Sequence, residues 1–448
     1  MFDHCYLVLE VSQTHLLITG VDERVDQQKT CHLCENPKKE SQPLCNSTYC
    51  SPGSIARDNM NLYYLNPLQR DLLSNGPLKL GLEGPAGTGK TLILLLQIIY
   101  NIKAESKFDI ILLAPGAHAQ QCKNILEFND ADVQMIDQFP LHPSNVVNRK
   151  HPSQPIVRIA ELRDFGEKCK NHPHLKPMSM LQEHIFVDDL QTLDDSRRDE
   201  TLRRLRELSD MSHIEINVWF AYDPVQGFKR NDLHRDLQKH FNGMAFQTLN
   251  AVLRNSRPII EAVDTEYSKQ AENFEIEKLV PLRQNGHSIN GPAVDCIVLT
   301  RSQGISIKQR YLKEILGKIF CDWPNVPTAV LYWDTNELCK SIVKELGKDV
   351  IDIKTFYDQG NKLQPSQIVC DSWSEAASFE VPLVVCVTVG YYVGLNYTAW
   401  SRARSKLIYI HLDDTLPYEN HPINIAEVKK KYPNARFTVK DSSEYDLE

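Results

Sequence analysis

The segment 84–91 carries the most specific chemical pattern in the chain, G-x-x-x-x-G-K-[ST]. Glycines let the backbone curl around a polyphosphate, so that its amides point inward at the phosphate oxygens. The lysine then reaches the β- and γ-phosphates, and the final hydroxyl can ligate Mg²⁺. A plain glycine-rich turn between a strand and a helix is the alternative. We predict an ATP-binding loop formed by Gly84, Pro85, Ala86, Gly87, Thr88, Gly89, Lys90 and Thr91.

Paired acids end an apolar run at 184–189, downstream of this loop. A nucleotide hydrolase needs a carboxylate that holds the metal and a second group that orients the attacking water. We therefore expect Asp188 to hold Mg²⁺ and Asp189 to act on water. Gln226, after the next apolar run, is placed to sense the γ-phosphate. Solvated turns at the ends of both runs are the alternative.

Other short motifs surround these residues along the chain. They are Leu-Asn-Pro-Leu-Gln at 65–69, Ala-Pro-Gly at 114–116, Asp-Pro-Val-Gln at 223–226, Leu-Asn-Ala-Val-Leu-Arg-Asn-Ser-Arg at 249–257, Asp-Ser at 371–372, Ala-Ser-Phe-Glu-Val at 377–381 and Ala-Trp-Ser-Arg-Ala-Arg at 399–404. In this order, with the phosphate loop and the paired acids, the set resembles superfamily 1 helicases. The resemblance spans roughly residues 60–412, and it is closest to the helicase-like C-terminal half of Schlafen proteins.

The resemblance implies a role for each motif. In the family's terms, the phosphate loop and the paired acids resemble Walker A and Walker B, and 223–226 resembles motif III. The segment 249–257 resembles motif IV, 371–372 with 377–381 motif V, and 399–404 motif VI. Gln69 would read adenine, and 114–116 would touch a nucleic-acid strand. Arg254 and Arg402 would approach the γ-phosphate from a second domain, with Arg402 as an arginine finger, and Glu380 would join the nucleotide site. A guanidinium suits this task because its fork binds phosphate twice and stabilises the charge that develops during transfer. Surface positions for these arginines are the alternative.

Three residues depart from the family pattern. Asp189 stands where glutamate is usual, so the carboxylate is one methylene shorter. Tyr222 and Ser378 stand where glycine is usual, in motifs III and V. None of them lies within the phosphate loop. ATP binding therefore follows more directly from the sequence than fast hydrolysis, and hydrolysis more directly than unwinding.

From about residue 60, short β-branched runs alternate with helical stretches, which predicts α/β units with parallel sheets. We expect strands at 79–83, 109–115, 184–189, 214–221, 295–300, 328–333, 381–388 and 405–411, and helices at 92–99, 196–208, 308–319 and 336–346. With the resemblance, this predicts two tandem RecA-like P-loop domains.

The expected division of the chain has four parts. They are an N-terminal extension with a Cys-rich insertion at 1–58, a first RecA-like domain with Walker A and B at 59–246, a second with motifs IV to VI at 247–435, and an acidic tail at 436–448 that frays. Residues 1–20 could form a strand pair, and 140–183 is the sizeable candidate insertion in the first domain.

Composition limits the class of protein. The chain has 448 residues, of which 42% are hydrophobic and 24% charged, with a net charge of −8, so a nucleic-acid surface must be a local basic groove. No signal peptide or membrane-length apolar run is visible, which predicts an intracellular protein, cytoplasmic or nuclear, without a membrane partner. Four cysteines could hold Zn²⁺, with an uncoordinated insertion as the alternative: Cys31, Cys34, Cys45 and Cys50.

Basic residues after the 223–226 motif could line a groove for single-stranded DNA or RNA, with Phe228 stacking on a base. A solvated helix face is the alternative reading of the same residues, which are Lys229, Arg230, Arg235, Lys239 and His240.

Two functions fit the whole pattern. The first is an ATP-dependent, nucleic-acid-stimulated NTPase of helicase or translocase type. The second is a regulatory nucleic-acid-binding module of Schlafen type that uses ATP as a conformational clamp and hydrolyses it weakly. A P-loop kinase would leave the ordered arginine motifs unexplained.

Overall fold

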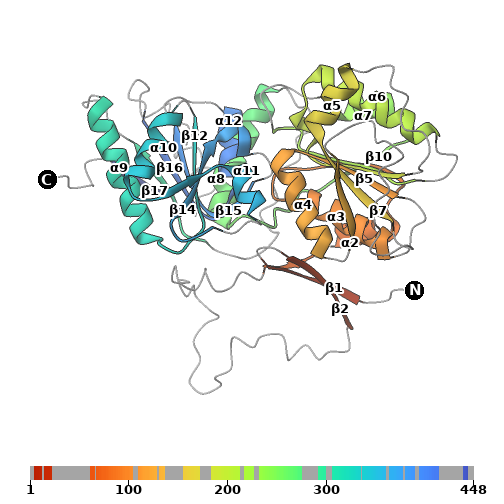
Figure 1. Ribbon diagram of the computed structural model, residues 1–448, viewed down its shortest axis with the longest axis horizontal. Coiled ribbons are helices and arrows are strands. Elements are labelled where there is room, and N and C mark those ends of the chain that lie inside the picture. The colour runs from red at the N-terminus through yellow and green to blue at the C-terminus, as the bar shows by residue number, and fades with distance from the viewer. Residues whose placement is uncertain are drawn as a thin grey trace.

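The computed structural model contains two parallel sheets with helices on their faces (Figure 1). It describes residues 5–12, 15–22, 61–65, 67–103, 109–128, 131–136, 155–171, 183–211, 216–226, 232–274, 291–298, 305–333, 335–359, 363–376, 379–388, 393–412 and 437–441. The elements of the first sheet precede those of the second in the chain, as the colour gradient of Figure 1 shows. Among the described residues, no helix combines the length and the apolar character that crossing a membrane requires.

The first sheet has seven strands in the order β10-β4-β9-β8-β5-β7-β6. Its strands are β4 (Lys79–Glu83), β5 (Asp109–Ala114), β6 (Asp132–Ile136), β7 (Ile156–Glu161), β8 (Glu183–Val187), β9 (Val218–Tyr222) and β10 (Ala245–Thr248). All are parallel. The carboxyl ends of β4, β9 and β8 are therefore neighbours, which brings the segments that follow these strands to one edge of the sheet.

Helices cover both faces of this sheet, as expected for parallel strands. They are α2 (Pro67–Asn75), α3 (Lys90–Lys103), α4 (Gly116–Phe128), α5 (Leu162–Asn171), α6 (Asp195–Met211) and α7 (Leu233–His240), with a 3₁₀ turn, η1 (Leu190–Thr192). Every residue of β5 is buried. Its side chains alternate between two apolar clusters, with Leu112 in one and Ile111 and Leu113 in the other, because successive strand residues point to opposite faces.

The second sheet also has seven strands, in the order β13-β14-β12-β15-β16-β11-β17. Its strands are β11 (Val294–Val298), β12 (Thr328–Trp333), β13 (Asp349–Ile351), β14 (Gln367–Ser372), β15 (Val381–Thr388), β16 (Ala403–His411) and β17 (Phe437–Asp441). Its helices are α8 (Arg257–Asn273), α9 (Ile305–Asp322), α10 (Asn336–Glu345), α11 (Ile353–Asp358) and α12 (Val393–Trp400), with the 3₁₀ turn η2 (Trp373–Ala376). One core cluster of this sheet extends to Ala86 and Val225 of the first α/β unit, so apolar packing continues between the two units.

The N-terminal residues form a separate three-stranded antiparallel sheet. It contains β1 (Cys5–Ser12), β2 (His15–Asp22) and β3 (Asn61–Tyr64), in the order β2-β1-β3. The strand pair expected within residues 1–20 is confirmed. In Figure 1 this sheet projects below the two larger ones.

Two segments differ from the sequence-based expectation. The region 140–183, expected to hold an insertion, contains β7, which pairs with both β5 and β6 inside the first sheet. The tail expected to fray contains β17, which pairs in parallel with β11. Phe437, Val439 and their neighbours alternate apolar and polar residues, and this pattern suits an edge strand despite the acidic residues around it.

Candidate nucleotide site

The phosphate loop lies between the end of β4 and the start of α3, which begins at Lys90. Gly87 and Gly89 have φ angles of +83° and +86°, a left-handed conformation that favours glycine. A Cβ on Gly87 would also lie 2.6 Å from Oδ1 of Asn255. The glycines of the motif therefore meet a requirement of the backbone, and the resulting loop opens onto a helix N-terminus that favours phosphate.

Lys90 is buried, and its ammonium contacts the loop itself. Nζ donates hydrogen bonds to the carbonyl oxygens of Gly84, at 2.7 Å, and Pro85, at 2.9 Å. Burial lowers the pKa of Lys90, and the carboxylates of Asp223, Asp189 and Asp188 oppose this effect. The two carbonyl oxygens are neutral acceptors, and they bind an ammonium less strongly than a charged phosphate does. Lys90, at a helix N-terminus, is therefore suited to exchange them for a phosphate. This loop therefore suits the phosphates of ATP.

Gln69, which was expected to read adenine, forms a hydrogen bond to the phosphate loop in this structure. It is fully buried, and its Nε2 donates to the carbonyl oxygen of Thr88 at 3.2 Å. The motif at 114–116, expected to contact a nucleic-acid strand, also makes a hydrogen bond within the protein. The backbone N–H of Gly116 donates to Oε1 of Glu161 at 3.2 Å. Both motifs therefore lie beside the site, bonded within the first domain.

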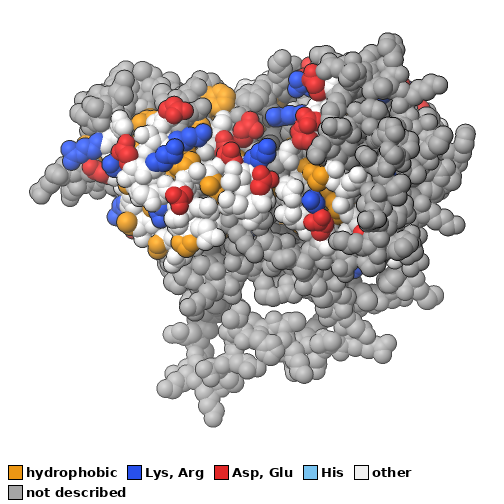
Figure 2. Space-filling model, in the orientation of Figure 1, with side chains coloured by type: hydrophobic (Ala, Val, Ile, Leu, Met, Phe, Trp, Pro, Cys, Tyr) orange, Lys and Arg blue, Asp and Glu red, His pale blue; other side chains and the backbone are white. Residues whose placement is uncertain are grey.

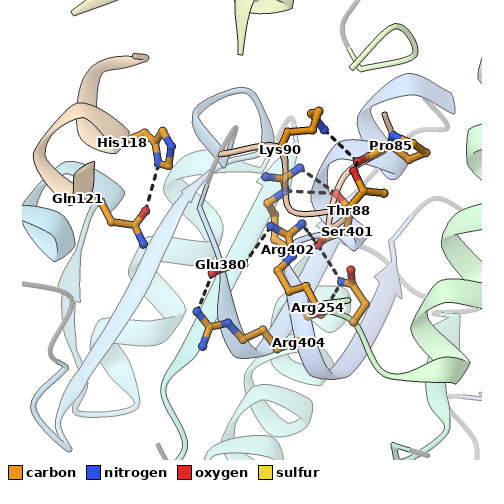
Figure 3. A network of polar contacts seen from close by, with 12 residues as sticks. Pro85, Thr88, Lys90, His118, Gln121, Arg254, Glu380, Ser401, Arg402 and Arg404 are labelled. Carbon is orange, nitrogen blue, oxygen red and sulfur yellow. Dashed lines mark hydrogen bonds and ion pairs between the residues drawn. The ribbon is translucent and has the colours of Figure 1, made fainter. Parts of the chain in front are cut away.

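Asp188 follows β8 and is almost completely buried. Its Oδ2 lies 3.0 Å from Nε2 of His118, a residue of α4 that the sequence patterns did not reveal. Nδ1 of His118 lies 3.1 Å from Oε1 of Gln121 (Figure 3). Burial opposes protonation of His118, but Cys122 and Asp188 raise its pKa well above the ordinary value. The expected metal carboxylate therefore lies within hydrogen-bonding distance of the imidazole of His118.

Asp189 adopts a left-handed backbone conformation, with φ 51° and ψ 45°. Aspartate tolerates this region better than most residues. Burial and the adjacent Asp188 raise the pKa of its carboxyl. Gln191 donates to Oδ1 of Asp189 at 2.9 Å and to Oε1 of Gln226 at 3.3 Å. Gln191 thus connects the two residues that the sequence assigned to water and to γ-phosphate sensing.

Arg254 lies between β10 and α8, in the part of the chain expected to belong to the second domain. Nη2 donates to the carbonyl oxygen of Ser401 at 2.8 Å, and Nη1 pairs with Oε2 of Glu380 at 2.9 Å. Arg404 pairs with the other oxygen of Glu380 at 2.6 Å (Figure 3). Burial alone would raise the pKa of Glu380, but Arg404 and Arg254 hold it at about 2. Glu380 is therefore a carboxylate bound by two guanidinium groups.

Arg402 is 2% exposed and comes from the turn after α12. Its Nε donates to the carbonyl oxygen of Thr398 at 2.9 Å, and its Nη2 donates to Oγ of Ser401 at 2.9 Å. Burial and the nearby Arg254 lower the pKa of Arg402 to about 10, while Asp189 opposes the shift. Arg402 therefore lies near Asp189, although Arg402 precedes β16 and Asp189 follows β8.

Backbone contacts bring the second unit onto the phosphate loop. The N–H of Leu253 donates to the carbonyl oxygen of Gly87 at 2.9 Å. The hydroxyl of Tyr397, on α12, accepts from the N–H of Ala86 at 2.7 Å. The structure therefore places the phosphate loop, Asp188, Asp189, Gln226, Arg254, Arg402 and Glu380 around one region. The sequence patterns missed His118, Gln191 and Tyr397 there, because side chains outside a motif carry no spacing signal.

A metal ion at this site would need ligands from a nucleotide as well as from the protein. In the described part of the chain, no group of three or more His, Cys, Asp or Glu side chains could hold a metal ion. Mg²⁺ in nucleotide sites is commonly held by one or two protein groups together with phosphates, and Asp188 with the half-buried Thr91 fits that pattern. The four cysteines expected to bind Zn²⁺ lie outside the described residues.

The basic residues expected to form a nucleic-acid groove are only partly described. Arg235 pairs with Asp232, and Lys239 and His240 both contact Asp199. The remaining candidates, Phe228, Lys229 and Arg230, lie outside the described residues. On the face in Figure 2, acidic and basic side chains alternate over the described surface. The three described basic candidates of α7 therefore each face an acidic side chain.

Comparison with known proteins shows the fold. A scan against protein-family models and a search of curated proteins found no match. Among solved structures, Saccharomyces cerevisiae Dbp5 bound to RNA and ADP–BeF₃ matches with a TM-score of 0.50 and 11% identity over 86% of this chain and 91% of its own. The two sheets are tandem RecA-like domains.

Two other similar structures are helicases. The Mycobacterium smegmatis helicase Lhr, bound to single-stranded DNA and AMP-PNP, has a TM-score of 0.48 and 11% identity over 78% of this chain and 46% of its own. Arterivirus nonstructural protein 10, a helicase, has a TM-score of 0.37 and 13% identity over 78% of this chain and 63% of its own. This chain therefore spans less than two thirds of either protein.

Proposed function

We propose that this chain is an ATP-dependent NTPase of helicase or translocase type that is stimulated by single-stranded DNA or RNA. The observation that carries the proposal is the composite site, in which Arg254 and Arg402 approach the phosphate loop from the far side of the domain junction. The likeness to Dbp5, a protein solved with RNA and ADP–BeF₃, supports it at the level of fold. The motif order further supports a superfamily 1 type related to Schlafen proteins.

The proposal assigns a task to each group. When bound, ATP with Mg²⁺ supplies the phosphoryl group that water attacks. Lys90 and the loop amides would bind the phosphate chain, while Thr91 and Asp188 would hold Mg²⁺. Asp189 orients and deprotonates water, and Arg402 stabilises the charge that develops during transfer. RecA-like domains at 59–246 and 247–435 would then change their relative position with the state of the nucleotide.

A second function remains in competition, since two observations favour it. The left-handed backbone of Asp189 and its bond to Gln191 restrict how its short carboxylate can reach water. Arg254 is held by Glu380 rather than directed only at the cleft. Both suit a regulatory nucleic-acid-binding module in which ATP closes the domains and is hydrolysed weakly.

Phosphate release from ATP, measured with and without single-stranded RNA and DNA, tests the proposal. The NTPase predicts turnover that rises with nucleic acid and falls about 10³-fold in Arg402→Ala, if this residue acts as an arginine finger. The clamp predicts ATP binding with little release under every condition. Equal, stimulated rates in the parent protein and Arg402→Ala would exclude the composite site.

A further inference from the structure

Tyr397 reaches from the second domain into the phosphate loop. It lies on α12 and is completely buried. Its hydroxyl accepts the N–H of Ala86 at 2.7 Å and donates to Oδ2 of Asp223 at 2.6 Å. Ala86 belongs to the loop and Asp223 follows β9, so one hydroxyl bonds two neighbouring strand ends of the first domain.

The position of this hydroxyl matters because the backbone amides of a phosphate loop are anion-binding donors. In this structure the Ala86 amide is satisfied by a neutral protein oxygen. Burial and Asp223 raise the pKa of Tyr397 well above its ordinary value, so the hydroxyl keeps its proton and can donate to Asp223. A phosphate oxygen that approached Ala86 would compete with Tyr397 for the same donor.

The ring of Tyr397 is held by the second domain. Its centroid lies 5.3 Å from that of Tyr267 on α8, and the two rings are tilted against each other. The Tyr267 hydroxyl is buried but has no hydrogen-bond partner in the described structure. Tyr267 therefore packs against Tyr397 without sharing its bonds, and it provides a matched control.

Glu380 makes a comparable contact with an arginine of the candidate site. Its carboxylate forms an ion pair with Arg254, the arginine that the proposed function directs at the γ-phosphate. Protein oxygens thus occupy contacts of both the phosphate loop and the arginine group.

We propose that Tyr397 is a built-in competitor for nucleotide, a latch that holds the second domain on the phosphate loop until phosphate displaces its hydroxyl. This inference rests on the proposed function for the identity of the displacing ligand. The contact between Tyr397 and Ala86, in contrast, is present in the structure itself. Nucleotide binding must break this contact, so removing the hydroxyl should favour binding.

Tyr397→Phe is the test variant, because it keeps the ring and removes only the hydroxyl. Hydrogen exchange of the peptide containing Ala86, measured without nucleotide, should be about tenfold faster than in the parent protein, because the amide loses its acceptor. ATP should bind about five- to tenfold more tightly, as measured by calorimetry. Tyr267→Phe should change neither quantity. The thermal unfolding midpoint of each variant verifies that it is folded.

Two results would overturn the latch. Unchanged exchange at Ala86 in Tyr397→Phe would show that the hydroxyl does not protect the amide. Faster exchange with equal or weaker ATP binding would show that the hydroxyl does not compete with phosphate. If neither protein bound ATP, the proposed function would fail, and the latch with it. If the parent bound ATP and the variant matched it in both measurements, only the latch would fail.

Discussion

Gln191 donates a hydrogen bond from Nε2 to the carboxylate of Asp189 over 2.9 Å. The same nitrogen donates to Oε1 of Gln226, and Oε1 of Gln191 accepts the N–H of Asp223 at 3.1 Å. Gln191 is 5% exposed. One amide side chain therefore fixes the carboxylate at the end of β8 relative to the turn that follows β9.

Replacement of Gln191 by alanine should loosen this connection. Asp189 would lose the donor that orients its carboxylate, so turnover should fall about tenfold, in the range of a lost positioning contact. The affinity for ATP should change little, because Gln191 touches no part of the phosphate loop among the contacts described above. Steady-state phosphate release together with calorimetric ATP titration measures both quantities. A loss of ATP affinity with unchanged turnover would contradict this role.

Replacement of Asp189 by asparagine separates chemistry from binding. Asparagine keeps the shape of the side chain and accepts a left-handed backbone, but it cannot take a proton from water. ATP binding should survive while turnover falls by about 10²-fold or more. Single-turnover phosphate release measures the effect.

Asp189→Glu provides the comparison for that variant. It restores the longer carboxylate side chain that is usual in superfamily 1 helicases, which this chain resembles. Glutamate tolerates a φ of 51° less well than aspartate does. Faster hydrolysis in Asp189→Glu would indicate a slow, clamp-like parent enzyme. An unchanged, nucleic-acid-stimulated rate in Asp189→Asn would remove Asp189 from the mechanism.

Strands with buried apolar runs could be predicted closely from the sequence. The predicted 79–83, 328–333 and 381–388 coincide with β4, β12 and β15, because each is bounded by turn residues and buried on both faces. β10, β13 and β14 were not predicted. β13 has only three residues, too short for a periodic signal, and β10 contains no buried residue.

The residues of the candidate site, like the strands, could be predicted only in part from the sequence. The phosphate loop could be predicted because its chemistry fixes residue types at fixed spacing, and the structure places Arg254 and Arg402 beside it. Tyr397 and His118 could not be predicted as contacts, because they meet Ala86 and Asp188 only through packing between distant segments. Glu380 was expected at the nucleotide, and the structure shows it bonded to two arginines, a geometry that no single motif encodes.

His184 should make the stability of the protein depend on pH. Its Nδ1 accepts the backbone N–H of Asn217 at 3.0 Å, and burial lowers its pKa from 6.5 to about 4. The unfolded chain therefore binds a proton that the folded chain excludes between these two values. This contribution to stability is complete above pH 6.5 and is lost as the pH falls toward 4.

Urea unfolding at pH 7 and pH 5 measures that loss. His184 alone should lower the free energy of unfolding by about 2 kcal/mol between these conditions. His184→Gln can still accept the Asn217 N–H but does not titrate, so its pH dependence should be smaller by that amount. Identical pH dependence in parent and His184→Gln would contradict the assignment.

The affinity of Lys90→Ala for ATP tests the central claim most directly. In the folded protein Lys90 bonds two carbonyl oxygens of the loop, and in the proposed complex it binds the phosphates instead. Calorimetric titration of ATP with Mg²⁺ should show binding to the parent protein and none to Lys90→Ala, while circular dichroism shows the same fold in both. If a folded Lys90→Ala bound ATP as tightly as the parent, the assignment of residues 84–91 as the nucleotide site would be wrong.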